Sequence, residues 1–374
     1  MRQLTIWASF LAGSLCLVPV LRSGEKPFFL GGQVIDASGT RGTVERRLDS
    51  AAAEFRKSGG GKSFFAAYEF TSRTKIHRGR DFRPVEGYVV NLRGSRIRIQ
   101  DKEPGKHEVS DEAYRKDSPS PAVLLLLRDP AAGGPILDVS VLDPEESYEF
   151  SAIPVYWLGT AEHAESLSFL QRSFDAGKAG PEDPETRRDL LFAISLHPGR
   201  QAYEILKKAA LGPEDDKVRE TAIFWLGNYG DAESLADLKE IYAGAKSDSI
   251  KKQVIFALQL SRRKEAVEEL IRIARRDPSQ EARKQAVFWL GQKATAESVK
   301  ALEDIVEGPA EESTLKEQAV FAISQLPKDK SVPMLIDIAS SNKSLSVRKK
   351  AMFWLGQSGD PAALQFFEEI LLKK

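Results

Sequence analysis

The strongest constraint on the fold is a short pattern centred on phenylalanine that recurs at a fixed distance along the second half of the chain. Aligned on this residue, the segments are LLFAIS, AIFWLG, VIFALQ, AVFWLG, AVFAIS and AMFWLG, and consecutive copies lie 32, 32, 32, 33 and 32 residues apart. Such a period is typical of stacked supersecondary units that bury one continuous core. The aligned residues are Phe192, Phe224, Phe256, Phe288, Phe321 and Phe353.

Each copy predicts a hairpin of two helices. Residues 281–292 fit one helix, and residues 296–308 fit the next, with apolar residues at spacings of three and four. In LGQSGDPAAL, Gly359 favours a left-handed helix end, Asp360 an N-cap and Pro361 a first helical turn. The segment LGNYGDAESL has the same order of residue types, so the repeats are expected to be stacked helical hairpins.

A divergent copy, PVYWLG, places Tyr156 at the phenylalanine position, 36 residues before Phe192. We interpret it as the first unit or its cap, which makes about seven hairpins. The residue after the aromatic position then alternates between large and small: Trp157, Ala193, Trp225, Ala257, Trp289, Ala322 and Trp354.

The tryptophans have two interpretations. Large side chains opposite small ones fill space between neighbouring layers, which favours a role in the core. Alternatively, a row of exposed tryptophans would form hot spots for binding a protein. Adjacent residues on a helix differ by about 100° in direction, so Phe and Trp cannot both point the same way. The candidate protein-binding residues are Trp157, Trp225, Trp289 and Trp354.

A basic residue lies five positions before each phenylalanine. A positive charge in the first turn of a helix opposes the helix dipole, so each is expected to contact an acidic or carbonyl group of a neighbouring unit, such as Asp216, Asp248 or Asp277. We interpret these residues as inter-repeat braces, with an anion site as the alternative. The basic ladder is Arg187, Arg219, Lys251, Arg283, Lys316 and Arg348.

The segment V-R-x-x-A-x-F-W-L-G-Q-x-G-D-P-A-A-L at 347–364 resembles the HEAT-like repeats first associated with phycobilisome lyases. From about Pro154 onward the chain also resembles exported bacterial HEAT-repeat proteins of undefined function. This resemblance implies a curved α-solenoid that binds other proteins. It also suggests a bilin-attaching lyase as an alternative, although no pigment site is marked in the sequence.

The part before the repeats has a different pattern. Residues 44–58 fit a helix, and strand-like runs occupy 63–72, 87–100, 122–127 and 135–142. Within 87–100, isoleucines alternate with arginines around Gly94, which predicts a half-buried hairpin. We expect a small α+β domain with an antiparallel sheet that caps the repeats.

The N-terminus has the layout of an export signal: Arg2, then an apolar run from Leu4 to Leu21. We expect cleavage near residue 23 and a periplasmic or secreted protein, with an uncleaved membrane anchor as the alternative. The only cysteine, Cys16, lies in this run, and the leucine before it gives weak support to lipidation. The chain has 54 basic and 54 acidic residues, which argues against a nucleic-acid partner.

Catalytic and metal-binding patterns are weak. The four histidines, His77, His107, His163 and His197, lack metal-ligand spacing. The single His-Glu pair, at 107–108, does not match the repeated pairs of the iron hydroxylases among HEAT proteins. Ser195 lacks the acidic partner of a triad, and GGGK at 59–62 predicts a turn. We therefore predict no catalytic residue, no metal and no cofactor.

Together these features predict a mainly α protein in three parts: a signal peptide at 1–23, an α+β domain at 24–150 and a HEAT-type α-solenoid at 151–374. We expect a non-enzymatic scaffold for one or more unidentified proteins in the cell envelope or outside the cell. The alternative is the lyase of the bilin-attachment type.

Overall fold

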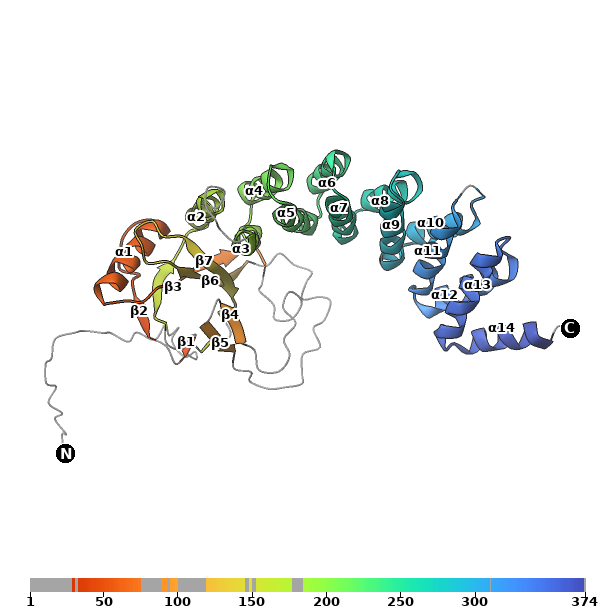
Figure 1. Ribbon diagram of the computed structural model, residues 1–374, viewed down its shortest axis with the longest axis horizontal. Helices are drawn as coiled ribbons and strands as arrows, with labels where there is room; N and C mark the ends of the chain where they lie inside the picture. Colours follow the sequence, from red (N-terminus) through yellow and green to blue (C-terminus); the bar gives the residue numbers. More distant parts are fainter. Residues whose placement is uncertain are drawn as a thin grey trace, which may run out of the picture. The chain divides into compact units, whose positions relative to one another are not determined.

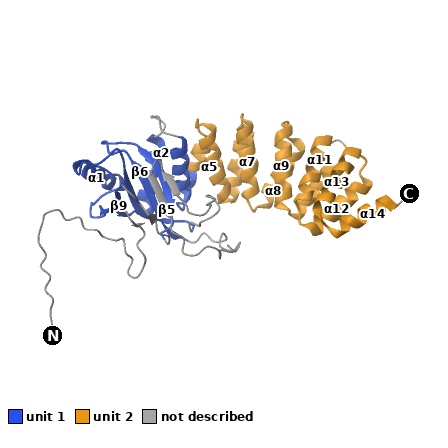
Figure 2. Ribbon diagram, turned by 60° about the horizontal axis from the view of Figure 1, so that its bottom comes forward, with its two compact units in different colours: residues 1–205 blue, residues 206–374 orange. Residues whose placement is uncertain are grey.

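The structure, a computed structural model, describes residues 29–30, 33–74, 89–92, 95–99, 119–144, 148–149, 153–176, 184–309 and 311–372. The chain forms two compact units, unit 1 at 1–205 and unit 2 at 206–374 (Figure 2). The sequence placed the domain boundary near residue 150, whereas the compact units divide inside a helix of the repeats. The expected signal segment, Cys16, His77 and His107 lie outside the described residues.

Unit 1 contains a five-stranded sheet whose strand order is β2-β9-β3-β6-β7 (Figure 1). Strands β3, β6 and β7 are antiparallel, but β9 is parallel to both β2 and β3, so the sheet is mixed. The strands are β2 (Val34–Asp36), β3 (Phe64–Ser72), β6 (Ser120–Arg128), β7 (Ile136–Leu142) and β9 (Val155–Thr160).

A second sheet has the strand order β1-β8-β5-β4. Its antiparallel hairpin pairs Leu92 of β4 with Ser95 of β5, which confirms the hairpin expected around Gly94. The strands are β1 (Phe29–Leu30), β4 (Val89–Leu92), β5 (Ser95–Ile99) and β8 (Tyr148–Glu149).

The expectation that PVYWLG begins a helical repeat was wrong. These residues form β9, in which Tyr156 pairs with Ile35 and with Ala66. The reason lies in Pro154, two positions before Tyr156, where the helical copies have a buried residue in mid-helix. Proline there removes a backbone donor and clashes with the preceding turn, which disfavours a helix through this segment.

Both faces of the five-stranded sheet are buried. On one face, Phe64 and Tyr156 contact Phe55 of α1 (Val44–Lys57), with ring centroids 5.2 and 6.3 Å away. Farther along, Tyr68 contacts Phe169 of α2 (His163–Ala176) at 6.1 Å. The opposite face carries an apolar cluster of Phe65, Ala67, Val123, Leu125, Leu127, Leu142 and Val155. Burial on both sides explains the apolar run in β6, which lacks the alternation of a half-exposed strand.

The first helix that carries the repeated phenylalanine pattern, α3 (Pro184–Ser195), belongs to unit 1 and packs on β7. Thr186 Oγ1 donates to the carbonyl of Leu137 at 3.2 Å, and the N–H of Arg73 donates to the carbonyl of Leu196 at 2.7 Å. The sheet therefore covers α3. Helix α4 (Arg200–Leu211) spans the division between the units.

Unit 2 is a stack of helical hairpins, as the period predicted. Within it the odd-numbered helices lie side by side in one row and the even-numbered helices in another (Figure 1). With α3 and α4, six hairpins carry the phenylalanine pattern in the described residues, and α2 precedes them. The helices of unit 2 after α4 are α5 (Asp216–Tyr229), α6 (Ala232–Gly244), α7 (Asp248–Leu260), α8 (Lys264–Arg276), α9 (Gln280–Lys293), α10 (Ala296–Glu307), α11 (Ser313–Ser324), α12 (Lys328–Ser341), α13 (Leu345–Ser358) and α14 (Pro361–Leu372).

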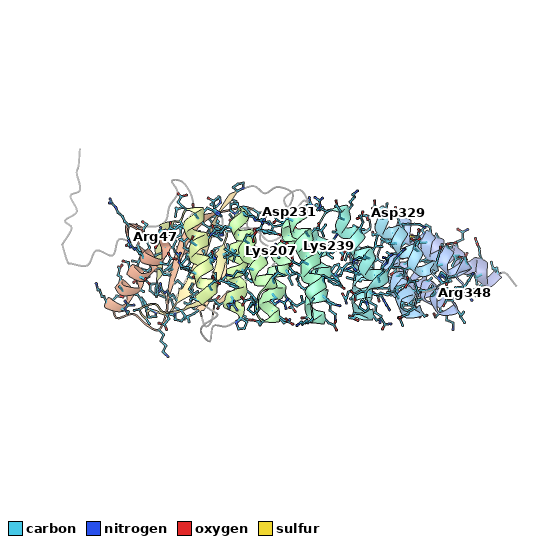
Figure 3. All side chains as sticks on the ribbon, turned by 90° about the horizontal axis from the view of Figure 1, so that it is seen from above. Arg47, Lys207, Asp231, Lys239, Asp329 and Arg348 are labelled. Atoms are coloured by element: carbon cyan, nitrogen blue, oxygen red, sulfur yellow. The ribbon has the colours of Figure 1, made fainter. Side chains whose placement is uncertain are left out.

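The turns between these helices follow the predicted chemistry. Gly230 and Gly359 end α5 and α13 in the left-handed conformation, with φ of 64° and 61°. Asp231 caps α6 by accepting the N–H of Ser234 at 2.8 Å (Figure 3). Helix α14 begins at Pro361, after Asp360, whose carboxylate accepts the N–H of Ala362. These residues fix where each hairpin turns.

Unit 1 contains a fully buried histidine. His197 lies in the turn after α3 and is 0% exposed. Its Nδ1 lies 2.9 Å from the carbonyl of Ala193, its Nε2 lies 2.9 Å from Ser166 Oγ, and its ring stacks on Phe70 at 4.7 Å. Burial lowers the pKa of His197 from 6.5 to about 4.

We expect acid to destabilise unit 1 through His197. The unfolded imidazole takes up a proton near pH 6.5, but the folded one only near pH 4. The stabilising contribution is therefore complete above pH 6.5 and is lost as pH falls towards 4, by about 3 kcal/mol in all. Amide hydrogen exchange of β3 and α3 peptides at pH 7 and pH 4.5 measures this loss. The variant His197→Asn keeps the carboxylates of the wild type and lacks the imidazole. The stability of its unit 1 should therefore depend less steeply on pH. Equal slopes in the two proteins would contradict the assignment.

Candidate protein-binding surface

The phenylalanines of unit 2 point away from the core. On α5 the buried residues Ala222 and Leu226 lie two positions before and two after Phe224, so they occupy the opposite side of the helix. None of the aligned phenylalanines of unit 2 is fully buried. Phe224, Phe256, Phe288 and Phe321 are half-buried, and Phe353 is 53% exposed. The aromatic stripe is therefore not the core that the size alternation favoured, and aliphatic residues such as Ala222 and Leu226 form the core instead.

Eight aromatic side chains of α5, α7, α9, α11 and α13 form one continuous chain of ring contacts, here called the aromatic row. Within a helix, Phe and Trp meet edge to face at 4.8 to 5.0 Å. Between helices, neighbouring rings lie 5.0 to 6.3 Å apart. The members are Phe224, Trp225, Phe256, Phe288, Trp289, Phe321, Phe353 and Trp354.

Two kinds of junction alternate along this row. At a glycine junction, Gly227 of α5 lies so close to Ala257 of α7 that a Cβ on the glycine would stand 2.8 Å from the alanine Cβ. Gly291 and Ala322 repeat this contact between α9 and α11. At both glycine junctions the phenylalanine planes are nearly parallel, at 14°. Because no Cβ intervenes, these helices approach closely.

The other junctions use tryptophan. Trp289 of α9 packs against Phe256 of α7 at 5.0 Å, and Trp354 of α13 packs against Phe321 of α11 at 5.1 Å. Tryptophan was expected to lie opposite alanine. Instead, each tryptophan meets the phenylalanine of the preceding hairpin, and the alanine meets a glycine backbone. The reason is that Ala257, Trp289, Ala322 and Trp354 all face the preceding odd-numbered helix, so none of these tryptophans faces one of these alanines.

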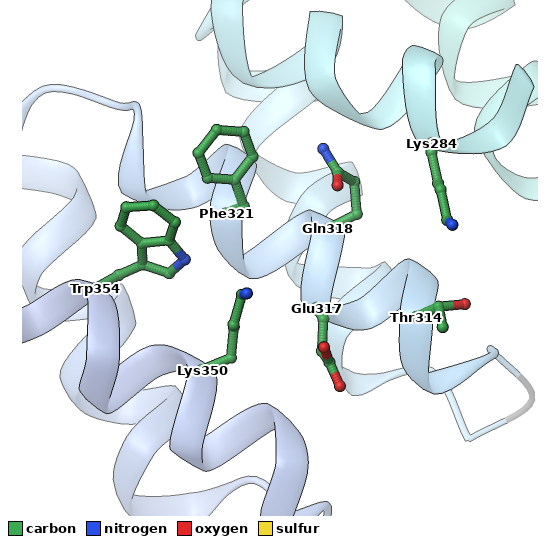
Figure 4. A pocket seen from close by; sticks show the side chains of 7 residues that line it. All are labelled: Lys284, Thr314, Glu317, Gln318, Phe321, Lys350 and Trp354. Atoms are coloured by element: carbon green, nitrogen blue, oxygen red, sulfur yellow. The ribbon is translucent and has the colours of Figure 1, made fainter. Parts of the chain in front are cut away.

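A hollow of about 270 Å³ opens beside the row between α9, α11 and α13 (Figure 4). Its apolar wall is formed by Phe321 and Trp354. Trp354 Nε1 is buried and has no hydrogen-bond partner among the described residues. Buried donors are normally paired, so this indole N–H is an exception to the usual pairing. The polar wall consists of Lys284, Thr314, Glu317, Gln318 and Lys350.

Three residues of the basic ladder contact the turns that precede their helices. Arg219 donates to the carbonyl of Ala210 at 3.1 Å, and Arg283 to that of Asp277 at 3.4 Å. Arg348 donates to the carbonyl of Asn342 at 2.6 Å (Figure 3). These carbonyls lie at the C-terminal ends of α4, α8 and α12, where the helix dipole is negative. Each of these arginines opposes the dipole of its own helix but complements the dipole of the helix before it.

Two ladder residues make other contacts. Lys251 lies 3.7 Å from Asp277, whose other oxygen accepts the Tyr242 hydroxyl at 2.7 Å. Arg187 lies 4.5 Å over the ring of Phe174 within unit 1. Each contact joins helices that are separate in sequence, so these residues act as braces and do not converge on one ligand.

Trp157 does not belong to the aromatic row. It lies in β9 of unit 1, half-buried beside the apolar cluster of the sheet. In the described part of the chain, no group of three His, Cys, Asp or Glu side chains is placed to hold a metal ion. The described helices also include none that is long and apolar enough to cross a membrane.

The stacked hairpins define a helical-repeat protein of the α-solenoid class. Residues 179–259 match the family of HEAT repeats, and residues 347–373 match the PBS lyase HEAT-like repeat. HEAT repeats are therefore present in the chain, and proteins of this kind generally use their extended surfaces to bind other proteins. No curated protein matches the chain.

Solved structures show distant similarity. Human deoxyhypusine hydroxylase in complex with glycerol is 16% identical, over 55% of this chain and 92% of that chain, with a TM-score of 0.27. YibA of Escherichia coli is 18% identical, over 55% and 77%, with a TM-score of 0.33. The complex of CpcE and CpcF of phycocyanin lyase from a Nostoc species is 17% identical, over 52% and 79%, with a TM-score of 0.31. Similarity at this level says nothing about activity.

Replacing glycine by alanine is expected to have opposite effects on stability at a filled junction and at the open position of α13. Gly227→Ala forces a methyl group against Ala257 and should destabilise unit 2 by about 1–3 kcal/mol. Gly356→Ala, at the same position of α13, meets nothing within 4 Å and should stabilise the helix by up to about 1 kcal/mol. Urea unfolding of the two variants measures both effects. If both substitutions shift the midpoint in the same direction, close approach is not what glycine provides.

Proposed function

We propose that this protein is a non-enzymatic scaffold that binds other proteins through the aromatic row of unit 2. The observation that carries the proposal is the row itself: eight rings in continuous contact, half-buried or exposed, on the side of the odd-numbered helices that faces away from the core. Aromatic side chains that are already held by their neighbours lose little conformational freedom on binding, which is why binding hot spots are rich in them.

The hollow adds a preference for the kind of segment that binds. The Trp354 ring offers an apolar wall, and the Gln318 amide offers both a donor and an acceptor. An extended segment of a partner has free backbone carbonyls and N–H groups that match this amide. Lys284 and Lys350 outnumber Glu317 at the rim, so the hollow favours a segment with an acidic side chain.

The place of action is part of the proposal. The charged residue followed by an apolar run at the N-terminus supports export, and the scaffold would then work in the cell envelope or outside the cell. Balanced charge over the chain supports protein partners over nucleic acid.

The alternative, a lyase that attaches a bilin, rests on the match of residues 347–373 to the PBS lyase HEAT-like repeat. A linear tetrapyrrole absorbs visible light, so the two functions can be separated directly. Purified full-length protein mixed with a bilin should show no saturable spectral change if it is a scaffold. A saturable change abolished by Trp354→Ala would favour the lyase.

We expect Trp354→Ala to lower the recovery of partner proteins from an envelope extract at least tenfold, because it removes a ring that forms the apolar wall of the hollow. The bait is the full-length protein, and recovery is measured by quantitative mass spectrometry. Trp354→Phe keeps a smaller ring, so it should give an intermediate recovery. Leu211→Ala, an exposed apolar residue of α4, is the matched control. Partners recovered equally by all four proteins would mean that the row is not the binding surface.

A further inference from the structure

Side-chain amides accompany the aromatic row. Helices α6, α8, α10 and α12 contain no asparagine or glutamine, whereas each odd-numbered helix from α5 to α13 contains at least one. Seven amides, in these odd-numbered helices or directly after them, lie three residues before or four residues after a phenylalanine of the row, and none of the seven is buried. We call them the amide ladder: Asn228, Gln253, Gln285, Gln292, Gln318, Gln325 and Gln357.

Contact with water alone does not explain this distribution. The even-numbered helices also have a surface exposed to water, and there it carries charged side chains, as on α8, where Lys264, Glu268 and Arg276 are exposed. Amides are thus concentrated on the helices that carry the rings. A property specific to the aromatic side of the stack is therefore needed to account for them.

The amide ladder lies on the same side of each helix as the row. Residues three before and four after a given position are turned from it by only about 60° and 40° around the helix axis. On α11, Gln318 and Phe321 both line the hollow (Figure 4). One set of amides lies about one turn towards the N-terminus of each helix and the other about one turn towards its C-terminus. A chain that crosses the helices along the row would pass between these two sets.

The amides have hydrogen-bonding capacity to spare. Asn228, Gln285 and Gln325 each donate one N–H to a neighbouring group of the chain. In the described part of the chain, Gln253 and Gln318 make no hydrogen bond, and both lie on helices with a neighbour on either side. Because each amide has two donors and an acceptor oxygen, the whole ladder can accept further partners.

The spacing of the helices selects the conformation of a bound chain. Packed helices lie about 8–10 Å apart. A β-strand presents the same side every two residues, or about 7 Å, which does not fit this spacing. An α-helix uses its own backbone groups in internal hydrogen bonds and would leave the amides unmatched. A polyproline II segment repeats every three residues, or about 9 Å, and its backbone groups make no internal hydrogen bonds.

We propose that the aromatic row binds a polyproline II segment of its partner, with an apolar residue at every third position, and that the amide ladder holds the backbone of this segment. The inference deepens the proposed function and rests on it, because both use the row. Aromatic-lined surfaces of other domains bind proline-rich segments in this conformation. A segment of about twelve residues would span the five odd-numbered helices from α5 to α13.

The charges beside the row set the register of this segment. Lys284 and Lys350 line the hollow, and neither forms an ion pair with another described residue. Two hairpins earlier, beside Trp289, the equivalent residues are Glu220 and Gln285. Two lysines therefore occur together at one place along the row, and an acidic residue of the segment binds there.

The test measures fluorescence anisotropy with full-length protein and a labelled peptide of five Leu-Pro-Pro triplets, in which glutamate replaces one proline of the central triplet. This probe should bind saturably. A peptide of the same length that alternates leucine and threonine, with one central glutamate, favours a strand and should bind at least tenfold more weakly.

Two variants test the roles of the amides and the lysines. The double variant Gln253→Ala and Gln318→Ala removes two hydrogen bonds to the backbone and should weaken binding of the proline probe about tenfold. Gln201→Ala removes an exposed amide of α4, outside the ladder, and should leave binding unchanged. Lys284→Glu should weaken binding of the glutamate probe, and a probe with lysine in place of glutamate should restore it.

The proposal is overturned if neither probe binds saturably, if both bind equally, or if the double amide variant binds as the wild type does. Failure of the proposed function gives a different result. If Trp354→Ala lowers the recovery of partners from the extract but the double amide variant does not, the scaffold function stands and only this inference fails. If Trp354→Ala leaves recovery unchanged, both fail.

Discussion

The packing of the hairpins in unit 2 depends on how closely consecutive odd-numbered helices approach each other. Where a glycine backbone receives an alanine methyl, the helices pack tightly and the phenylalanine rings stack in parallel planes. Where tryptophan follows phenylalanine, its indole ring fills the junction and tilts by 46° or 43° against the preceding ring. The structural unit is therefore a pair of hairpins. Tryptophan appears once per pair, so a ligand that recognises the row meets the same chemistry only at every second hairpin.

Much of this could be predicted from sequence, and one signal was overlooked. The period of the phenylalanine pattern predicted the hairpins. Gly230, Asp231 and Gly359 predicted the turns between helices, because turn and cap preferences act locally. The glycine three residues after phenylalanine accompanies tryptophan in every copy, as in Gly227 and Gly291, whereas the alanine copies carry Gln259 and Ser324. That pairing shows which junction is tight. The hollow beside Trp354 was not predictable, since it depends on side chains from three helices.

The sheet was harder to predict for a physical reason. Its parallel strands β2 and β9 pair Ile35 with Tyr156, residues far apart in the chain, and no local pattern encodes such a contact. Arg46 and Arg47 are neighbours on α1, yet only Arg47 is buried. Its guanidinium donates to the carbonyls of Leu158 and Thr160 and pairs with Glu165. Those bonds offset the loss of hydration, and they exist only because β9 ends beside α1.

The parts of the proposed binding surface differ in how firmly the free protein holds them. Each ring of the aromatic row is supported by its neighbours, so the row is rigid before any partner arrives. Helix α14 has neighbours on one side only, and its outer positions face water where α6 and α10 are covered. Segments with few buried contacts open at low free energy, so the end hairpin is expected to be the least stable part of unit 2. Helix α13 of this hairpin carries Trp354 and with it one wall of the hollow. A partner that binds only the closed form of the hairpin therefore shifts that equilibrium by mass action.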